Sequence, residues 1–182
     1  MQPPPLWMII YGEGGTGKSK VIQTVTEIFA QLGAKCMLIK SAYTGVAASL
    51  IDGKTTHTLA SLSMGRDGAQ SDESKAKLQQ MWQHNQYLII DEYLMIGKTH
   101  LAHLSCNISI GKEGSNLQCL GYSFGGVNVI LCGNLHQFPP VAQPLSESLY
   151  CPINMATDSI DHQLGWAIYE EFKTVVILKE QM

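Results

Sequence analysis

The residues best suited to chemistry lie near the N-terminus, in the run Gly12-Glu13-Gly14-Gly15-Thr16-Gly17-Lys18-Ser19. This run fits the phosphate-binding loop G-x-x-x-x-G-K-[ST]. A glycine-rich turn lets backbone N–H groups face a triphosphate, Lys18 supplies charge for the β- and γ-phosphates, and the Ser19 hydroxyl can bind Mg²⁺. The motif predicts a nucleotide site whose phosphate-binding residues are Gly12, Gly14, Gly15, Thr16, Gly17, Lys18 and Ser19.

An acidic pair, Asp91-Glu92, follows the apolar run Tyr87-Leu88-Ile89-Ile90. An aspartate at such a strand end can hold the metal, and the adjacent glutamate can take a proton from an attacking water. A carboxylate in this place suits hydrolysis by water, whereas a small-molecule kinase passes the phosphoryl group to a bound hydroxyl. We expect Asp91 and Ser19 at the metal and Glu92 as the general base. The alternative is an acidic turn without a chemical role.

A third polar segment, residues 133–141, follows the apolar run 127–132 and contains Gln137. A glutamine amide can donate to the γ-phosphate and accept from the attacking water, which lets it sense whether the nucleotide is cleaved. We nominate Gln137 for this catalytic role. Taken alone, Gln-Phe-Pro-Pro is a rigid turn, and a structural role would then be the simpler interpretation.

These groups need a scaffold that brings them to one place. Short apolar runs, typical of buried strands, occupy residues 6–11, 36–39, 87–90, 127–132 and 174–178. Helical spacing of apolar residues, or an alanine-rich composition, marks residues 21–32, 45–51, 75–82, 94–104 and 161–172. We expect loops or irregular structure at residues 63–74, 105–126 and 141–158. The alternation predicts an α/β fold with a mainly parallel sheet, whose carboxyl edge binds ligands.

Composition describes one globular, intracellular domain. The chain has 182 residues, of which 45% are hydrophobic and 15% charged, the opposite of the balance in disordered sequences. The net charge of −3 gives no overall basic footprint, so any nucleic-acid contact must be local. Five widely spaced cysteines without a C-x-x-C pair indicate a reduced compartment. Since no apolar run approaches the roughly eighteen residues that span a bilayer, we expect no membrane partner.

Further motifs lie in order along nearly the whole chain. They are Thr44-Gly45-Val46-Ala47-Ala48 with Gly53-Lys54-Thr55-Thr56-His57, then Ile89-Ile90-Asp91-Glu92-x-x-Met95-Ile96, then Phe124-Gly125-Gly126 and Cys132-Gly133-x-x-x-Gln137-Phe138-Pro139-Pro140-Val141. Together with the phosphate-binding loop, they resemble the Pif-family DNA helicases of superfamily 1B, whose relatives include the helicase parts of Helitron transposons. The resemblance implies a P-loop NTPase fold, the first RecA-like motor domain of an ATP-dependent DNA helicase.

The resemblance also implies site roles. It gives Lys18 the phosphates, Ser19 and Asp91 the Mg²⁺, Glu92 the general-base role and Gln137 the γ-phosphate sensor, with ATP and Mg²⁺ as cofactors. The family motifs that touch single-stranded DNA fall on Thr44, Gly45, Val46, Thr55, His57 and Thr58. Hydroxyls, backbone N–H groups and a histidine can hydrogen-bond phosphates without reading base sequence. For His57, an ordinary capping or core histidine is the alternative.

The family resemblance also implies a direction of movement, a cellular location and cellular roles. It implies 5′-to-3′ translocation on single-stranded DNA, a nuclear location, and roles in DNA repair, recombination and telomere maintenance. Two departures leave other functions open: Asn134 stands where the family usually has aspartate, and Leu94 where it has a small hydroxyl residue. A neutral amide supports a nearby cation less strongly than a carboxylate does. The alternatives are a catalytically degenerate P-loop domain, or a different P-loop ATPase or kinase.

The last residues, Leu178 to Met182, resemble the run that precedes an arginine motif of the family. We therefore expect residues 1–182 to form a single, monomeric motor domain without the second motor domain and its arginines. The expected outcome is a chain that binds Mg–ATP, hydrolyses it poorly and does not unwind DNA. Nucleotide binding, phosphate release and strand-separation assays check this, and robust DNA-stimulated unwinding by this chain alone would refute it.

Overall fold

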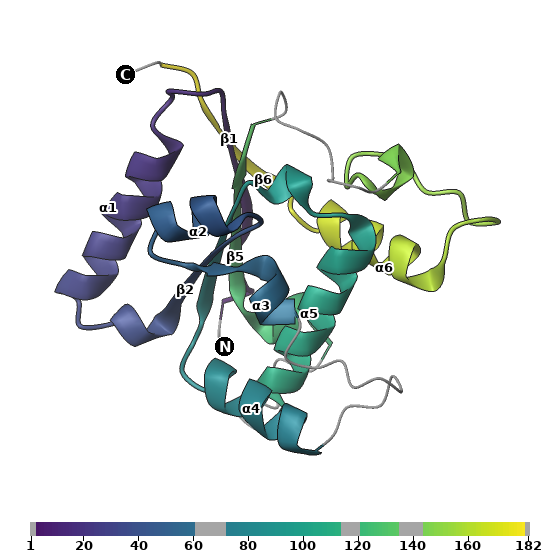
Figure 1. Cartoon of the computed structure of the whole chain (residues 1–182), viewed down its shortest axis with the longest axis horizontal. Helices are drawn as coiled ribbons and strands as arrows, with labels where there is room; N and C mark the ends of the chain where they lie inside the picture. Colours follow the sequence, from purple (N-terminus) through teal and green to yellow (C-terminus); the bar gives the residue numbers. More distant parts are fainter. Residues whose placement is uncertain (1–2, 61–71, 114–120, 135–143, 181–182) are drawn as a thin grey trace.

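The computed structural model describes residues 3–60, 72–113, 121–134 and 144–180, which form one six-stranded sheet with helices on both faces (Figure 1). Every pair of neighbouring strands in the sheet is parallel, so the predicted mainly parallel α/β sheet is confirmed. The strand order across the sheet is β3 (Lys54–Thr55), β2 (Leu38–Ala42), β4 (Tyr87–Asp91), β5 (Asn128–Gly133), β1 (Trp7–Gly12) and β6 (Thr174–Leu178).

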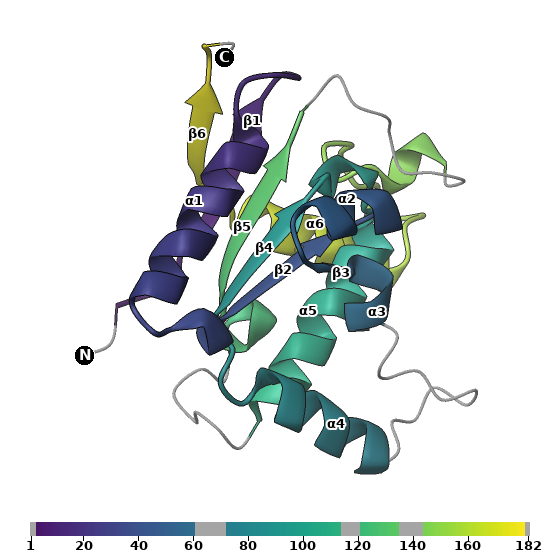
Figure 2. The ribbon, with the colours of Figure 1, turned by 60° about the vertical axis from the view of Figure 1, so that its left-hand side comes forward.

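The helices cover the two faces unequally (Figure 2). Their bounds are α1 (Lys18–Gln31), α2 (Gly45–Leu50), α3 (Thr56–Ala60), α4 (Asp72–Trp82), α5 (Lys98–Lys112) and α6 (Ile160–Glu170). Apolar side chains of α1 and α2 join one core cluster with the sheet, and side chains of α3 to α6 join a larger one. None of the helices within the described residues has the length and hydrophobicity needed to cross a bilayer.

The strand β2 begins later than its apolar run predicts. Residues 36 and 37 belong to a short 3-10 turn, and the strand continues through Lys40 and Ser41 to Ala42. The sequence predicts that the strand ends at the polar Lys40-Ser41, whereas in the structure it ends at Ala42. Pairing decides the matter, because β2 runs beside β4 in register from Leu38 opposite Tyr87 to Ala42 opposite Asp91. Backbone hydrogen bonds to a central strand hold polar residues in a strand that composition alone would end.

Helix α5 extends through a region in which the sequence predicts irregular structure. Its residues 105–112 are rich in polar and small side chains, yet several of them are buried and partnered. The Ser105 hydroxyl accepts from the backbone N–H of Phe124, and the Asn107 amide donates to the carbonyl of Ala60. Gly111 lets the helix approach Trp82, since a Cβ there would lie 2.6 Å from the indole. Tertiary contacts therefore stabilise the second half of the helix, where buried polar and small residues interrupt the apolar pattern.

The expected loop at 63–74 is only partly testable, because residues 61–71 lie outside the described part of the chain. Residues 72–74 belong to α4, so the helix predicted at 75–82 begins three residues earlier. Asp72 and Glu73 occupy its first turn, where acidic side chains favour a helix N-terminus. Elsewhere the predicted helix at 161–172 and strand at 174–178 correspond to α6 and β6.

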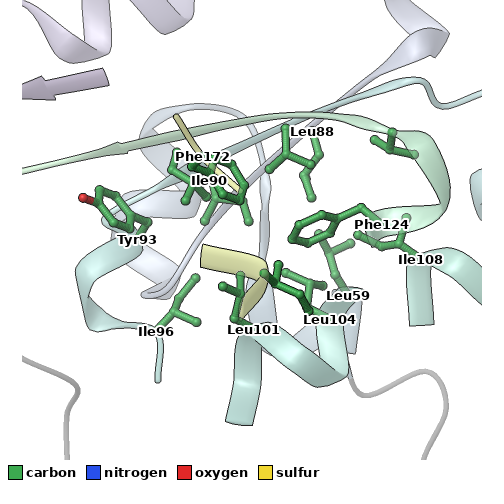
Figure 3. Packing of buried hydrophobic residues seen from close by; sticks show 14 of the residues in the cluster. Leu59, Leu88, Ile90, Tyr93, Ile96, Leu101, Leu104, Ile108, Phe124 and Phe172 are labelled. Atoms are coloured by element: carbon green, nitrogen blue, oxygen red, sulfur yellow. The ribbon is translucent and has the colours of Figure 1, made fainter. Parts of the chain in front are cut away.

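The larger core lies between the sheet and α5 (Figure 3). Phe124 and Trp82 are fully buried in it, and the Phe124 ring meets the Phe172 ring edge-on at 6.2 Å between centroids. Leu94 is also a member of this cluster, with 3% of its surface exposed. The unusual leucine after Asp91-Glu92 therefore packs in the core.

Helix α6 crosses the start of α5 at Gly165. A Cβ on this residue would collide with the backbone carbonyl of Lys98, which leaves room for glycine alone. The Lys98 side chain is fully buried, and its ammonium donates to the carbonyl of Ser146 at 2.8 Å. The contact thus fixes where α6 lies on α5.

We expect Gly165→Ala to destabilise the fold by about 1–3 kcal/mol, because backbone must shift to admit the methyl group. For a chain of this size that corresponds to a fall of roughly 2–12 °C in the midpoint of thermal unfolding. The matched control is Ala167→Ser on the exposed side of the same helix, which should change stability by less than about 0.5 kcal/mol. Equal midpoints for Gly165→Ala and the parent would contradict the packing argument.

Candidate nucleotide and DNA site

The phosphate-binding loop joins the end of β1 to the start of α1, as the motif predicts. Gly17 takes a left-handed conformation with φ of 84° at the N-cap of α1, a region that glycine enters without strain. Gly12 is packed closely, since a Cβ there would strike the Thr16 hydroxyl and lie 3.1 Å from the Leu178 Cβ. Two of the motif glycines are thus required by the backbone path itself.

Lys18 lies over its own loop. Its ammonium donates to the carbonyl oxygens of Gly12 at 2.5 Å and Glu13 at 2.8 Å. The Thr16 hydroxyl donates to the same Glu13 carbonyl at 2.8 Å, and Thr16 is buried. The Thr16 side chain therefore stabilises the loop from inside, and Lys18 is held close to where a phosphate would lie.

A cavity of about 400 Å³ opens beside this loop. It is lined by Gly14, Gly15, Gly17, Lys18, Ser19, Ala47, Leu50, Asp91 and Glu92. The loop residues and the acidic pair are predicted, from separate stretches of sequence, to share a nucleotide site, and Ala47 and Leu50 come from the helical segment predicted at residues 45–51, whose start is expected to contact DNA. The fold brings them to one cavity at the carboxyl edge of the sheet, where open parallel sheets bind ligands.

The two acidic residues differ in environment. Burial raises the pKa of Asp91, while a hydrogen bond from the Glu92 backbone N–H to Asp91 Oδ1 at 3.0 Å and the Lys18 charge act in the opposite direction. Glu92 has a φ of 55°, which is uncommon for a residue with a side chain and marks a sharp turn at the end of β4. The turn places both carboxylates on the same cavity.

Thr44 connects this cavity to the predicted DNA segments. Its hydroxyl donates to Glu92 Oε2 at 3.2 Å and accepts from the backbone N–H of Ala47, which caps α2. Gly45 begins the helix and Val46 is 75% exposed on it. A residue predicted for DNA thus contacts the residue predicted as general base.

The other predicted DNA residues lie where β3 meets α3. The hydroxyls of Thr55 and Thr58 are 2.7 Å apart, and Thr55 Oγ1 also accepts from the Thr58 backbone N–H. His57 is exposed, so it is not a core histidine. Its ring lies 4.9 Å, between centroids, from the rings of both Tyr43 and His100.

The sequence analysis does not predict the two neighbours of His57, Tyr43 and His100, as site residues. Burial lowers the pKa of His100 to about 4, with smaller effects from nearby histidines, so this ring is neutral at pH 7. Tyr43 directly precedes Thr44, and that adjacency is the signal that sequence reasoning could have used. His100 lies on α5, far from His57 in the sequence, and no local pattern points to the pair.

The third predicted element is described only in part. Gln137 lies outside the described residues, which stop at Asn134 after β5. Asn134 is buried, with 8% of its surface exposed. Gly133 packs against Tyr93, because a Cβ would lie 2.7 Å from that ring, and this contact joins the ends of β4 and β5.

Known proteins resemble this chain in sequence. The model of the PIF1-like helicase family matches residues 2–160. The ATP-dependent DNA helicase RRM3 of Saccharomyces cerevisiae is 30% identical over 136 residues, which is 72% of this chain and 18% of that protein. The ATP-dependent DNA helicase PIF1 of Xenopus laevis is 32% identical over 143 residues, which is 77% of this chain and 21% of that protein. The chain thus spans about a fifth of the length of these relatives.

Solved structures agree in fold. The Pif1 helicase from Candida albicans matches with a TM-score of 0.63 at 23% identity, over 97% of this chain and 37% of that chain. The Pif1 helicase from Bacteroides in complex with ADP-AlF3 and single-stranded DNA matches with a TM-score of 0.67 at 20% identity, over 100% of this chain and 40% of that chain. These neighbours confirm the predicted P-loop NTPase, RecA-like fold. Because the family model matches most of this chain, residues 2–160, the chain belongs to the PIF1-like helicase family.

Proposed function

We propose that this chain is the ATP-binding first motor domain of a DNA helicase, which couples ATP hydrolysis to movement on single-stranded DNA. One contact carries the proposal: the Thr44 hydroxyl, on the predicted DNA surface, donates to Glu92 in the nucleotide cavity. A DNA motor needs the two sites to influence each other, and this contact joins them directly. Family membership supports a helicase over the alternatives of a different P-loop ATPase or a kinase.

The cavity residues divide the chemistry between them. Lys18 would exchange its loop carbonyls for the β- and γ-phosphates, and the Ser19 hydroxyl with the Asp91 carboxylate offers the hard oxygen ligands that Mg²⁺ prefers. When bound there, Mg²⁺ supplies charge that offsets the negative charge on the phosphates. Glu92 would take the proton of the attacking water, and Gln137 would sense the γ-phosphate.

The DNA strand would cross the exposed N-terminal ends of α2 and α3. Thr44, Gly45 and Val46 lie at the first, and Thr55, His57 and Thr58 at the second. Their hydroxyls, ring nitrogens and backbone amides would contact backbone phosphates, which gives binding without base specificity. A flat ring such as His57, supported by Tyr43 and His100, could also stack on a base.

The proposal extends to the protein as a whole. The part of this chain that matches the relatives makes up only 18% and 21% of their lengths, so a second motor domain would complete the nucleotide site in the full protein. As a Pif-type motor it would move 5′ to 3′ and act in the nucleus, in DNA repair, recombination or telomere maintenance. The isolated domain would be a monomer.

Replacing Asp91 should have opposite effects on the stability of the nucleotide-free protein and on the binding of Mg–ATP. Because burial raises its pKa, the folded state binds the proton more tightly than the unfolded chain, and ionisation at pH 7 costs stability. Asp91→Asn keeps an oxygen for the Glu92 N–H and removes the charge. It should raise the stability of the nucleotide-free protein slightly, by less than about 1 kcal/mol given solvent screening. It should also lose the stabilisation by Mg–ATP, about 2.7 kcal/mol at a hundredfold excess over Kd.

Thermal unfolding at pH 7, with and without Mg–ATP, measures both effects. Asp72→Asn, an exposed aspartate at the start of α4, is the matched control and should keep the full response to Mg–ATP. If Asp91→Asn responds to Mg–ATP as the parent does, Asp91 does not hold the metal.

The contact between Thr44 and Glu92 predicts coupling of the two sites. Nucleotide and DNA should change each other's affinity by about fivefold or more, and Thr44→Val should reduce this factor to below about twofold. Thr44→Ser retains the hydroxyl that donates to Glu92 and caps α2, so it should keep the coupling. Anisotropy of a labelled oligo(dT), with and without Mg and a non-hydrolysable ATP analogue, measures the factor.

Two outcomes would count against the proposal in different ways. Failure of the parent chain to bind oligo(dT) at low salt would refute the proposed DNA-binding surface. Undiminished coupling in Thr44→Val would leave the surface but remove the role of the contact. Thr24→Val, which deletes an exposed hydroxyl on α1, is the matched control and should behave as the parent.

A further inference from the structure

A second cavity, of about 300 Å³, lies between α1, β2 and the turn that leads into β3 (these elements are labelled in Figure 2). It shares no lining residue with the nucleotide cavity. Three lysines from three separate elements line it: Lys35 before β2, Lys40 within β2 and Lys54 at the start of β3. Asp52 is the one acidic residue among its lining residues.

Lys40 is the unusual member of this set. Its side chain is only 10% exposed, and its ammonium lies 3.8 Å from Asp52 Oδ2, beyond hydrogen-bond distance. Within the described residues, no other acceptor pairs with this ammonium. The Asp52 carboxylate is itself 90% exposed, so water rather than Lys40 is its main partner. A largely buried cation without a hydrogen-bond acceptor is costly, and an anion in the cavity would remove that cost.

The walls of the cavity are fixed by the fold. A Cβ on Gly53 would lie 2.7 Å from the carbonyl oxygen of Lys40, so only glycine lets this turn pack down on β2. Phe29 contributes an apolar wall, and its ring is held edge-on against Tyr87 at 5.0 Å between centroids. Leu38 adds to the apolar side. The cavity therefore combines a basic rim with an apolar wall.

We propose that this cavity binds a phosphate group of a nucleotide, with Lys40 as the buried donor and Lys35 and Lys54 as supporting charges. Lysine ammonium groups bind phosphate as point charges, and the apolar wall suits the sugar or base attached to it. The phosphate belongs either to a free nucleotide or to a nucleic-acid strand, since both present the same chemistry. The cavity shares no lining residue with the proposed nucleotide cavity or with the proposed DNA residues, although Lys54 directly precedes Thr55 in β3.

Residue-resolved NMR titration of the whole chain tests the proposal. The amide signals of Gly53 and Lys54 report on this cavity, and those of Gly15 to Ser19 report on the nucleotide cavity, so either site can fail alone. Inorganic phosphate, dTMP and oligo(dT) are added separately. We expect Gly53 and Lys54 to shift with a Kd of about 1 mM or lower for at least one probe. A response to dTMP alone indicates a free nucleotide, and a response to oligo(dT) alone indicates a strand.

Substitutions then identify the donor. Lys40→Gln should weaken binding about tenfold, because a charged hydrogen bond is lost, while Lys40→Arg should retain part of it. Lys77→Gln, on the exposed face of α4, is the matched control and should leave the titration unchanged. The exposed pair Lys35→Gln and Lys54→Gln keeps the buried lysine and should weaken binding about threefold, which tests the site if Lys40 variants fold poorly.

The proposal is overturned if Gly53 and Lys54 do not respond to any of the three probes. It is also overturned if they respond equally in the parent, in folded Lys40→Gln and in the exposed double variant. Shifts confined to Gly15 to Ser19 would leave the nucleotide cavity in place and remove the second site.

Discussion

The parallel register of the sheet is the constraint on which the nucleotide cavity depends. Asp91 pairs with Ala42 on one side and with Cys132 on the other, while Gly12 pairs with Leu178. The segments that carry the proposed site residues therefore all begin where strands end, along one edge of the sheet. Apolar cores on both faces of the sheet hold this register, because a slip of one residue would turn buried side chains to the opposite face. Packing far from the cavity thus determines the position of its carboxylates relative to its phosphate-binding loop.

Sequence patterns predicted the parts of this structure that local physics controls. The strands and the phosphate loop follow from apolar runs and from a motif in which close packing requires Gly12 and a left-handed backbone favours Gly17. The second half of α5 could not be predicted, because its polar residues are stabilised by partners such as Phe124 and Ala60. For the same reason β2 continues through the polar Lys40 and Ser41 to Ala42, since its pairing with β4 decides where it ends. Long-range contacts override composition in both cases.

The candidate site also has parts that the sequence predicts and contacts that it does not. The residue types of Lys18, Ser19, Asp91 and Glu92 and their order in the chain predicted a common cavity, which the fold forms. The hydroxyl contact of Thr44 with Glu92 joins residues 48 positions apart, and a threonine after a strand does not specify its acceptor. Lys40 shows the same limit, because a lysine within a short strand gives no sign that its ammonium is buried without a hydrogen bond.

The contacts of Lys18 bear on how fast a nucleotide can come and go. Its ammonium already makes two hydrogen bonds to loop carbonyls, so in the proposed function an arriving phosphate would replace these carbonyls as the partner of a side chain that is already ordered. Little conformational entropy would be lost in that exchange, which would favour rapid loading. On release the carbonyls would recapture the ammonium, which would lower the barrier to dissociation. A loop of this kind suits a repeating cycle better than tight storage of one nucleotide.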